Sequence, residues 1–245
     1  MQILCALCGK YNKLTMDNIF YTSSENITNN QLQLTGQEAR HAAKVLRFNI
    51  GDELFASDGK GNVYRTTITS ITKSSVLAEI EETHFEPEPN IKKVLAFGAI
   101  KKRDRLEFAV EKAVELDAWE ICIFDADHSE RSRINEERLA SIALSAFKQS
   151  KRKWLPEIII KRSMDEVLEH YLDHQAIIAH IPEESVQHKS LEHNDNLLLI
   201  GPEGGFSERE IKLCTERNGQ FISLGRNRLR AETAVMAILS QYLFE

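Results

Sequence analysis

From residue 91 onward, short apolar runs alternate with stretches of helical periodicity, and this alternation limits the possible folds more than any other feature. Short apolar runs predict buried strands, and apolar residues spaced three and four apart predict amphipathic helices. The expected strands are Val94–Ile100, Ile121–Asp125, Glu157–Ile160, Ala176–His180, Leu197–Ile200 and Phe221–Leu224, and the expected helices lie near 104–117, 135–150, 164–172, 207–217 and 231–243. Strands that alternate with helices form right-handed crossover units, so we expect an α/β fold whose parallel sheet is covered on both faces.

The stretch between Asn18 and Phe85 has a different pattern. Short segments there alternate apolar and polar residues, which is typical of strands with one face exposed. The expected strands are Gln31–Leu34, Glu53–Ser57, Asn62–Ile71 and Val76–His84, with one short helix from Gln37 to about Arg47. Because Asp58–Asn62 has the residues of a hairpin turn, we expect a small antiparallel β-barrel in this half of the chain.

The segment Phe85–Asn90 fits neither pattern, and it contains Pro87 and Pro89. Each proline removes a backbone donor and biases the residue before it toward extended conformations. We therefore expect a first domain over residues 16–86 and a second domain over residues 91–245. Residues 1–15 are expected to be an unstructured extension, with Met16 as a candidate start.

Composition excludes several classes of protein. The 245 residues allow two domains with hydrophobic cores, and no apolar run approaches the roughly 18 residues of a membrane-spanning helix. The net charge of −6 argues against coating nucleic acid by bulk charge, although local basic patches remain compatible with it. Four scattered cysteines are too few for a disulfide framework, which favours a reducing, cytoplasmic compartment. They are Cys5, Cys8, Cys122 and Cys214.

No metal site is expected. Cys5 and Cys8 form a C-x-x-C pair, but no second cysteine or histidine pair follows at the spacing of a zinc site. His170 and His174 lie four residues apart near the end of an expected helix, and such an isolated pair is a weak indication of a metal.

A glycine-rich loop follows the strand expected at Leu197–Ile200. It reads Gly201-Pro202-Glu203-Gly204-Gly205-Phe206, and Ser207 and Glu210 then form a capping box that opens a helix. Its glycines let a ligand approach the backbone closely, at an edge of the sheet where parallel-sheet proteins bind ligands. A tight turn without a ligand is the alternative. The spacing is not that of a dinucleotide loop, and Glu203 would repel a pyrophosphate, so an uncharged or cationic nucleoside-like ligand suits the loop better.

A second loop, Leu224–Arg230, follows the last expected strand and carries Arg226, Arg228 and Arg230. The arginines are either ligand contacts or solvated side chains. Glu232, at the start of the next helix, has an alternative structural role, because an acid in the first turn is favourable with the helix dipole. Both loops end strand-helix units near the C-terminus, so they are candidates to border one pocket.

Basic residues gather in two further places on this acidic chain. Lys148, Lys151, Arg152 and Lys153 precede Trp154, and a second group comprises Lys101, Lys102, Arg103, Arg105, Arg131 and Arg133. Together they give the chain phosphate-binding capacity. The alternative is that each is an ordinary solvated charge.

The two loops together resemble the paired signature of the ribosomal RNA small subunit methyltransferase E family. The resembling stretches are Ile200–Phe206 and Leu224–Ala234. Further likeness to the family covers Arg40–Arg47, Lys101–Leu116 and His128–Ser132, so that the resemblance extends over nearly the whole chain from Met16. Residues 1–15 fall outside it.

The resemblance implies a SPOUT-class enzyme that uses S-adenosylmethionine. It implies a C-terminal domain with a trefoil knot, an N-terminal PUA-like RNA-binding barrel, and a homodimer with its sites near the subunit interface. The implied reaction is methylation of N3 of a uridine near the decoding centre of 16S rRNA, within the small ribosomal subunit. The alternatives are another SPOUT-class tRNA or rRNA methyltransferase and a non-catalytic RNA-binding protein that keeps the fold.

The resemblance also implies roles for individual residues. The expected cofactor-binding residues are Leu199, Ile200, Gly201, Pro202, Glu203, Gly204, Gly205, Leu224, Gly225, Leu229, Arg230 and Ala231. Arg230 is the leading catalytic candidate and Glu232 a weaker one. The expected RNA-binding residues are Arg40, Lys44, Arg47, Lys101, Arg103, Arg131, Lys151 and Arg152. One departure stands out: where the family commonly has Gly-Pro-Arg, this chain has Gly225-Arg226-Asn227-Arg228, which changes the rigidity and charge of a cofactor loop.

Overall fold

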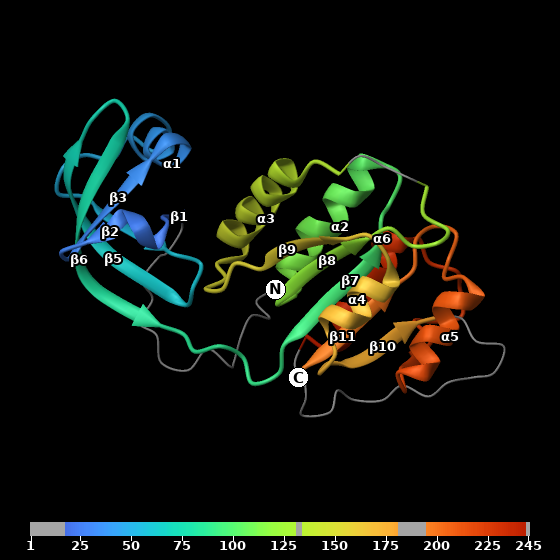
Figure 1. Cartoon of the computed structure of the whole chain (residues 1–245). Coiled ribbons are helices and arrows are strands. Elements are labelled where there is room, and N and C mark those ends of the chain that lie inside the picture. Colours follow the sequence, from blue (N-terminus) through green and yellow to red (C-terminus); the bar gives the residue numbers. More distant parts are fainter. Residues whose placement is uncertain (1–17, 131–133, 181–194, 244–245) are drawn as a thin grey trace, which may run out of the picture. The chain divides into compact units, whose positions relative to one another are not determined.

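The computed structural model describes residues 18–130, 134–180 and 195–243, and it divides into two compact units (Figure 1). The N-terminal unit contains the described residues from Asn18 to Asp58 together with Asn62–His84. The C-terminal unit contains Gly59–Gly61 and the chain from Phe85 onward. The expectations for residues 1–15, for Cys5 and Cys8, and for Arg131 and Arg133 lie outside the described residues.

The N-terminal unit is built on one six-stranded sheet in the order β1-β4-β5-β6-β3-β2. Its strands are β1 (Ile19–Tyr21), β2 (Ile27–Thr28), β3 (Gln31–Thr35), β4 (Glu53–Ser57), β5 (Asn62–Ile71) and β6 (Ser75–Phe85). The β-rich unit was predicted, but the purely antiparallel arrangement was wrong, because β1 pairs with β4 in parallel. The inward faces of these strands bury Phe20, Leu32, Leu54 and Val76 in a common apolar core.

The one helix expected in this unit has two parts. Residues Gly36–Arg40 form α1, and His41–Val45 continue as a π-helical turn. Ala39 and Ala42 point into the core of the unit. The segment ends at Arg47, whose φ of +57° is left-handed and stops the helical path.

The C-terminal unit contains a six-stranded sheet in the order β12-β10-β11-β7-β8-β9, and every pair in it is parallel. The strands are β7 (Lys93–Gly98), β8 (Glu120–Phe124), β9 (Glu157–Lys161), β10 (Gln175–Ala179), β11 (Asn196–Ile200) and β12 (Gln220–Ile222). The predicted parallel sheet is therefore confirmed. The central strands β7 and β11 are buried along their whole length, which explains why apolar residues follow one another in both after the first residue, Lys93 in β7 and Asn196 in β11.

Helices cover both faces of this sheet (Figure 1). They are α2 (Arg103–Glu115), α3 (Glu136–Ser150), α4 (Met164–His170), α5 (Glu208–Glu216) and α6 (Ala231–Gln241). On one face α2 packs against both α3 and α6. On the other face α4 and α5 share an apolar core with the strands, to which they contribute Met164, Val167 and Cys214. Both faces are thus covered, as the sequence predicts.

The sheet order positions the loops of interest. Strand β10 lies between β11 and β12, so the strands that precede the two loops are not neighbours in the sheet. Because all three strands are parallel, their carboxyl ends nevertheless meet at one edge. The trefoil knot stays a prediction. Among the described residues, no helix is long and apolar enough to cross a membrane.

Candidate functional site

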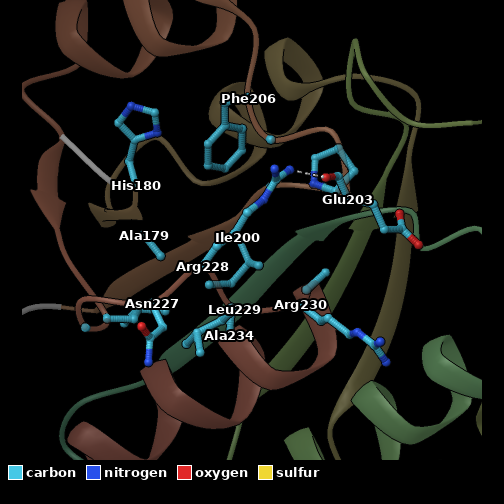
Figure 2. A pocket seen from close by; sticks show the side chains of 16 residues that line it. Ala179, His180, Ile200, Glu203, Phe206, Asn227, Arg228, Leu229, Arg230 and Ala234 are labelled. Atoms are coloured by element: carbon cyan, nitrogen blue, oxygen red, sulfur yellow. Dashed lines mark hydrogen bonds between the residues drawn. The ribbon is translucent and has the colours of Figure 1, made fainter. Parts of the chain in front are cut away.

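A cavity of about 410 Å³ opens at the carboxyl ends of β10, β11 and β12 (Figure 2). Three segments border it. The residues that line it are Ala179, His180, Ile200, Gly201, Pro202, Glu203, Gly205, Phe206, Leu224, Gly225, Asn227, Arg228, Leu229, Arg230, Ala231 and Ala234. The two loops singled out in the sequence therefore border one pocket, as expected.

The first loop follows β11 and forms one rim of the cavity. A hydrogen bond from Gly205 N to Pro202 O (2.9 Å) closes a turn, and Gly205 has a φ of +75°, which only glycine adopts at low cost. Gly98, at the end of β7, lies under this turn. A Cβ atom on Gly98 would come within 2.6 Å of Pro202, so this close approach also requires a glycine.

The far end of the first loop is held by the start of α5. The side chain of Ser207 accepts a hydrogen bond from Glu210 N, and Ser207 N donates in turn to the Glu210 carboxylate (2.8 Å), which completes the predicted capping box. The buried Glu210 carboxylate also accepts from Asp127 N (3.0 Å), in the loop after β8. One buried carboxylate thus ties two loops of the sheet edge together.

Asp127 extends this connection outward to Arg209. The carboxylate of Asp127 accepts from the guanidinium of Arg209 (2.8 Å) and from the hydroxyl of Ser207, and these contacts lower its pKa to about 2. Arg209 also pairs with Asp165 (2.7 Å), at the start of α4. The cluster fixes the loop after β8 and the starts of α4 and α5.

The second loop crosses toward the first. Gly225, with a φ of +137°, needs the conformational freedom of glycine. Nη2 of Arg228 donates to the carbonyl oxygen of Glu203 (3.0 Å), so a side chain of the second loop reaches the backbone of the first (Figure 2). The loop ends at Arg230, the N-cap of α6, whose carbonyl accepts from Ala234 N (2.8 Å).

The expected cofactor-binding residues line the cavity except for two. Leu199 is fully buried inside β11, and Gly204 packs against His128, where a Cβ atom would come within 2.8 Å. The lining residues that the sequence interpretation missed are Ala179, His180, Phe206, Asn227 and Ala234. Arg228 also lines the cavity, and a ligand contact was one of the two alternatives given for it. The end of β10 was the available signal for Ala179 and His180, because it is a third strand end at the same edge.

The two catalytic candidates have different surroundings. Arg230 is exposed at the cavity and has no ion-pair partner among the described residues. Glu232 is buried and does not line the cavity, and its carboxylate lies 3.5 Å from Nε of Arg105, on α2. Its other carboxylate oxygen has no hydrogen-bond partner in the described part of the chain. This placement favours a structural role for Glu232, between α2 and α6.

The expected RNA-binding residues fall into groups. In the N-terminal unit Arg40, Lys44 and Arg47 are all exposed. In the C-terminal unit Arg103 is exposed beside Glu107, and Lys101, also exposed, forms an ion pair with Glu130. All five side chains remain accessible to a phosphate.

Lys151 and Arg152 are neighbours with opposite placements. Lys151 is exposed at the left-handed C-cap of α3. The guanidinium of Arg152 is buried, where it donates to Val114 O (3.0 Å) and Ala118 O (2.9 Å) and pairs with Asp117 (3.1 Å). Burial lowers its pKa from the ordinary arginine value. These contacts favour a structural role for Arg152 at the carboxyl end of α2 over the expected RNA-binding role, which stays a prediction.

The described residues contain no group of three or more histidine, cysteine, aspartate or glutamate side chains that could hold a metal ion. Cys122 and Cys214 are buried and free, and burial raises the pKa of each thiol to about 12. Neither thiol belongs to the cavity lining.

Comparison with protein families gives two matches. Residues 87–243 match the RNA methyltransferase domain family, and residues 34–81 match the RNA methyltransferase PUA domain family. Among curated relatives, the ribosomal RNA small subunit methyltransferase E of Bacillus subtilis is 31% identical over 229 residues, which cover 86% of this chain and 89% of the relative. The protein of the same name from Rickettsia conorii is 29% identical over 245 residues, with 95% of each chain covered.

Solved structures show the same likeness. A ribosomal RNA small subunit methyltransferase E from Neisseria gonorrhoeae, bound to S-adenosyl methionine, superposes with a TM-score of 0.76 at 26% identity. A methyltransferase from Legionella pneumophila, in complex with the bound cofactor SAM, gives a TM-score of 0.78 at 27% identity. Each match covers 91% of this chain and 95% of the solved chain.

Proposed function

The chain belongs to the RNA methyltransferase family, and its relatives include ribosomal RNA small subunit methyltransferases E. We propose that it methylates N3 of a uridine in 16S rRNA. It is an S-adenosylmethionine-dependent rRNA methyltransferase. The acceptor atom is the proposed part. The observation that carries the proposal is the single cavity bordered by the Gly201–Phe206 and Leu224–Arg230 loops, the two stretches in which the chain most resembles that family.

The cavity fits S-adenosylmethionine. Its volume of about 410 Å³ lies within the range of small-molecule sites. Open space lies beside the backbone at Gly205 and Gly225, so a ligand can approach both loops closely. Ile200, Leu224 and Leu229 supply apolar surface for an adenine ring. We assign the binding of adenosine and methionine to the backbone and apolar groups of these loops.

When bound, S-adenosylmethionine supplies an electrophilic methyl group, so positioning of the acceptor accounts for much of the catalysis. N3 of uridine carries a proton, and its loss places negative charge on the flanking carbonyl oxygens of the base. A cation beside those oxygens stabilises the anionic base. Arg230 is exposed at the cavity and has no acidic partner among the described residues, which supports this role.

Glu232 receives a different assignment. A general base must reach the proton that it removes, and Glu232 is buried beside Arg105, outside the cavity lining. We propose that it holds the start of α6 against α2 and thereby positions Arg230.

The exposed basic residues Arg40, Lys44, Arg47, Lys101, Arg103 and Lys151 are proposed to bind phosphates around the target base. The base must leave any stack that hides N3 before it reaches the cavity. The proposed substrate is the assembled small ribosomal subunit, the proposed working form is a homodimer, and the proposed compartment is the cytoplasm, where assembled subunits are found.

The test is transfer of labelled methyl from S-adenosylmethionine to small subunits from cells that lack the modification, followed by nucleoside analysis. Labelled 3-methyluridine in 16S rRNA is the expected product. Label in a ribose, in another base or in tRNA instead would move the chain to the alternative SPOUT-class activities. A folded protein that neither binds the cofactor nor transfers label would be the non-catalytic RNA-binding protein.

A further inference from the structure

Arg228 crosses the cavity. Its backbone belongs to the second loop, and its guanidinium donates to the carbonyl oxygen of Glu203 in the first (3.0 Å). Figure 2 shows the side chain extending between the two loops, past Ile200 and toward Phe206. One N–H group of this exposed side chain therefore connects the guanidinium to the cavity wall.

The charge around Arg228 is unbalanced. An arginine has five N–H donors, and a planar pair of them matches a carboxylate. Other arginines of the C-terminal unit pair with acids, as Arg209 does with Asp127 and Asp165. Among the described residues no carboxylate pairs with Arg228, and Glu203 accepts through its carboxylate from Lys101 N (3.3 Å) instead.

Arg230 does not compete for the same position. Figure 2 shows its side chain extending away from His180 and Phe206, on the far side of the start of α6. The two cations therefore face different parts of the site. Arg228 extends between the two loops, whereas Arg230 lines the cavity at the start of α6.

We propose that Arg228 binds the carboxylate of the methionine moiety of S-adenosylmethionine while it keeps its hydrogen bond to Glu203 O. This inference rests on the proposed function, since it assumes that the cavity is the cofactor site. The lining is otherwise mainly apolar or formed by backbone groups, and the ligand has one anionic group to place.

The test compares two ligands that differ by the carboxylate alone, S-adenosylmethionine and decarboxylated S-adenosylmethionine. Their dissociation constants are measured by calorimetry without RNA, so that no turnover occurs. The variants are R228M, which replaces the guanidinium with an unbranched apolar side chain, and R228K, which keeps the positive charge. R226M is the matched control, because Arg226 is exposed in the same loop and does not line the cavity.

The wild-type protein should prefer the carboxylated ligand by about tenfold or more, as a charge-assisted contact predicts. R228M should lose most of this preference while its affinity for the decarboxylated ligand stays within about threefold of wild type. R228K should recover part of the preference, and R226M should keep all of it.

Two outcomes would overturn the inference. A preference that persists in R228M would exclude the contact. Equal weakening of both ligands would make Arg228 only a link between the loops. The proposed function fails in a different way: a wild-type protein that binds neither ligand has no cofactor site, and the identity of the methylated atom does not enter this measurement.

Discussion

Arg230 and Glu232 lie two positions apart, yet the start of α6 separates their surroundings. Arg230 is the N-cap and remains exposed at the cavity, whereas Glu232 is the second residue of the helix and lies beside Arg105. The sequence predicted the loops that contain such residues because glycines and arginines stand out. It did not predict which side chains face the ligand, since that depends on the direction in which each residue leaves the backbone.

Replacement of Arg230 by alanine should separate catalysis from binding. The variant should lower kcat about 100-fold, because one donor to a developing negative charge has this typical effect. The dissociation constant for S-adenosylmethionine should change by less than about threefold. Single-turnover methyl transfer and calorimetry check the two quantities, with Arg226→Ala as the control. Equal losses in rate and in cofactor affinity would contradict the catalytic role of Arg230.

Asp127 should make stability depend on pH in the acid range. Its pKa in the folded protein is about 2, below the value of about 3.9 for an unfolded chain. Its ionised form therefore stabilises the fold fully above about pH 4, and this contribution is lost as the pH falls toward 2.

Asp127→Asn tests this dependence. Urea unfolding at pH 6 and pH 3 should show a smaller acid loss of stability in Asp127→Asn than in wild type, by roughly 1 kcal/mol after allowance for solvent screening of this partly exposed group. Asp125→Asn is the control, because Asp125 is exposed two positions earlier in the chain. An identical pH dependence in Asp127→Asn and wild type would remove Asp127 from the stabilising cluster.

At the scale of elements, the periodic pattern predicted the helices and the long strands of both units. It failed for β1 and β2, which are three and two residues long and too short to show a period. It also could not give the sheet order, because the position of β10 between β11 and β12 depends on tertiary contacts, which the local sequence pattern does not determine. The shared pocket was predictable for a simpler reason, since all parallel strands end at the same edge.

Arg152 and Lys151 are neighbouring basic residues with different surroundings, so their substitutions can be compared. Arg152 binds the carboxyl end of α2, and Lys151 is the exposed C-cap of α3. Arg152→Ala should lower the free energy of unfolding by about 2 to 3 kcal/mol, because two backbone carbonyl groups lose their hydrogen-bond donor and Asp117 loses its ion-pair partner. Lys151→Asn should leave stability nearly unchanged, since asparagine tolerates the left-handed conformation of this position.

The two variants should act oppositely on RNA. Lys151→Asn should reduce the salt dependence of rRNA affinity by about one unit of slope, as loss of one phosphate contact predicts. Arg152→Ala should leave that slope unchanged at a temperature where the protein is folded. Urea unfolding measures stability, and filter binding measures the salt dependence of rRNA affinity. If Arg152→Ala lowered that slope and Lys151→Asn did not, Arg152 would be an RNA contact.

At the scale of the whole molecule, a chain of net charge −6 must bind a polyanion through local patches. The exposed cations of the N-terminal unit form one such group, with Arg40 and Lys44 on adjacent helical turns. The sequence predicted this exposure from residue type and position. The placement of the two units along the RNA is a separate property that local patterns do not contain.

Arg40→Gln combined with Lys44→Gln should weaken rRNA binding more at low salt than at high salt. The slope of log affinity against log salt should fall by about two units, and cofactor affinity should stay at the wild-type value. Lys73→Gln, at an exposed turn of the same unit, serves as the control. An unchanged slope in the double variant would remove this unit's helix from the RNA contact.

The cavity draws all of its lining from residues 179–234, whereas the N-terminal sheet is complete by Phe85. A ribosome adds roughly 5 to 20 residues per second, and domains generally fold in the order of their synthesis. A nascent chain therefore completes its N-terminal sheet at least several seconds before the residues of the cavity have all been synthesised. During that interval it carries the domain that matches the RNA methyltransferase PUA family but has no site for a methyl donor.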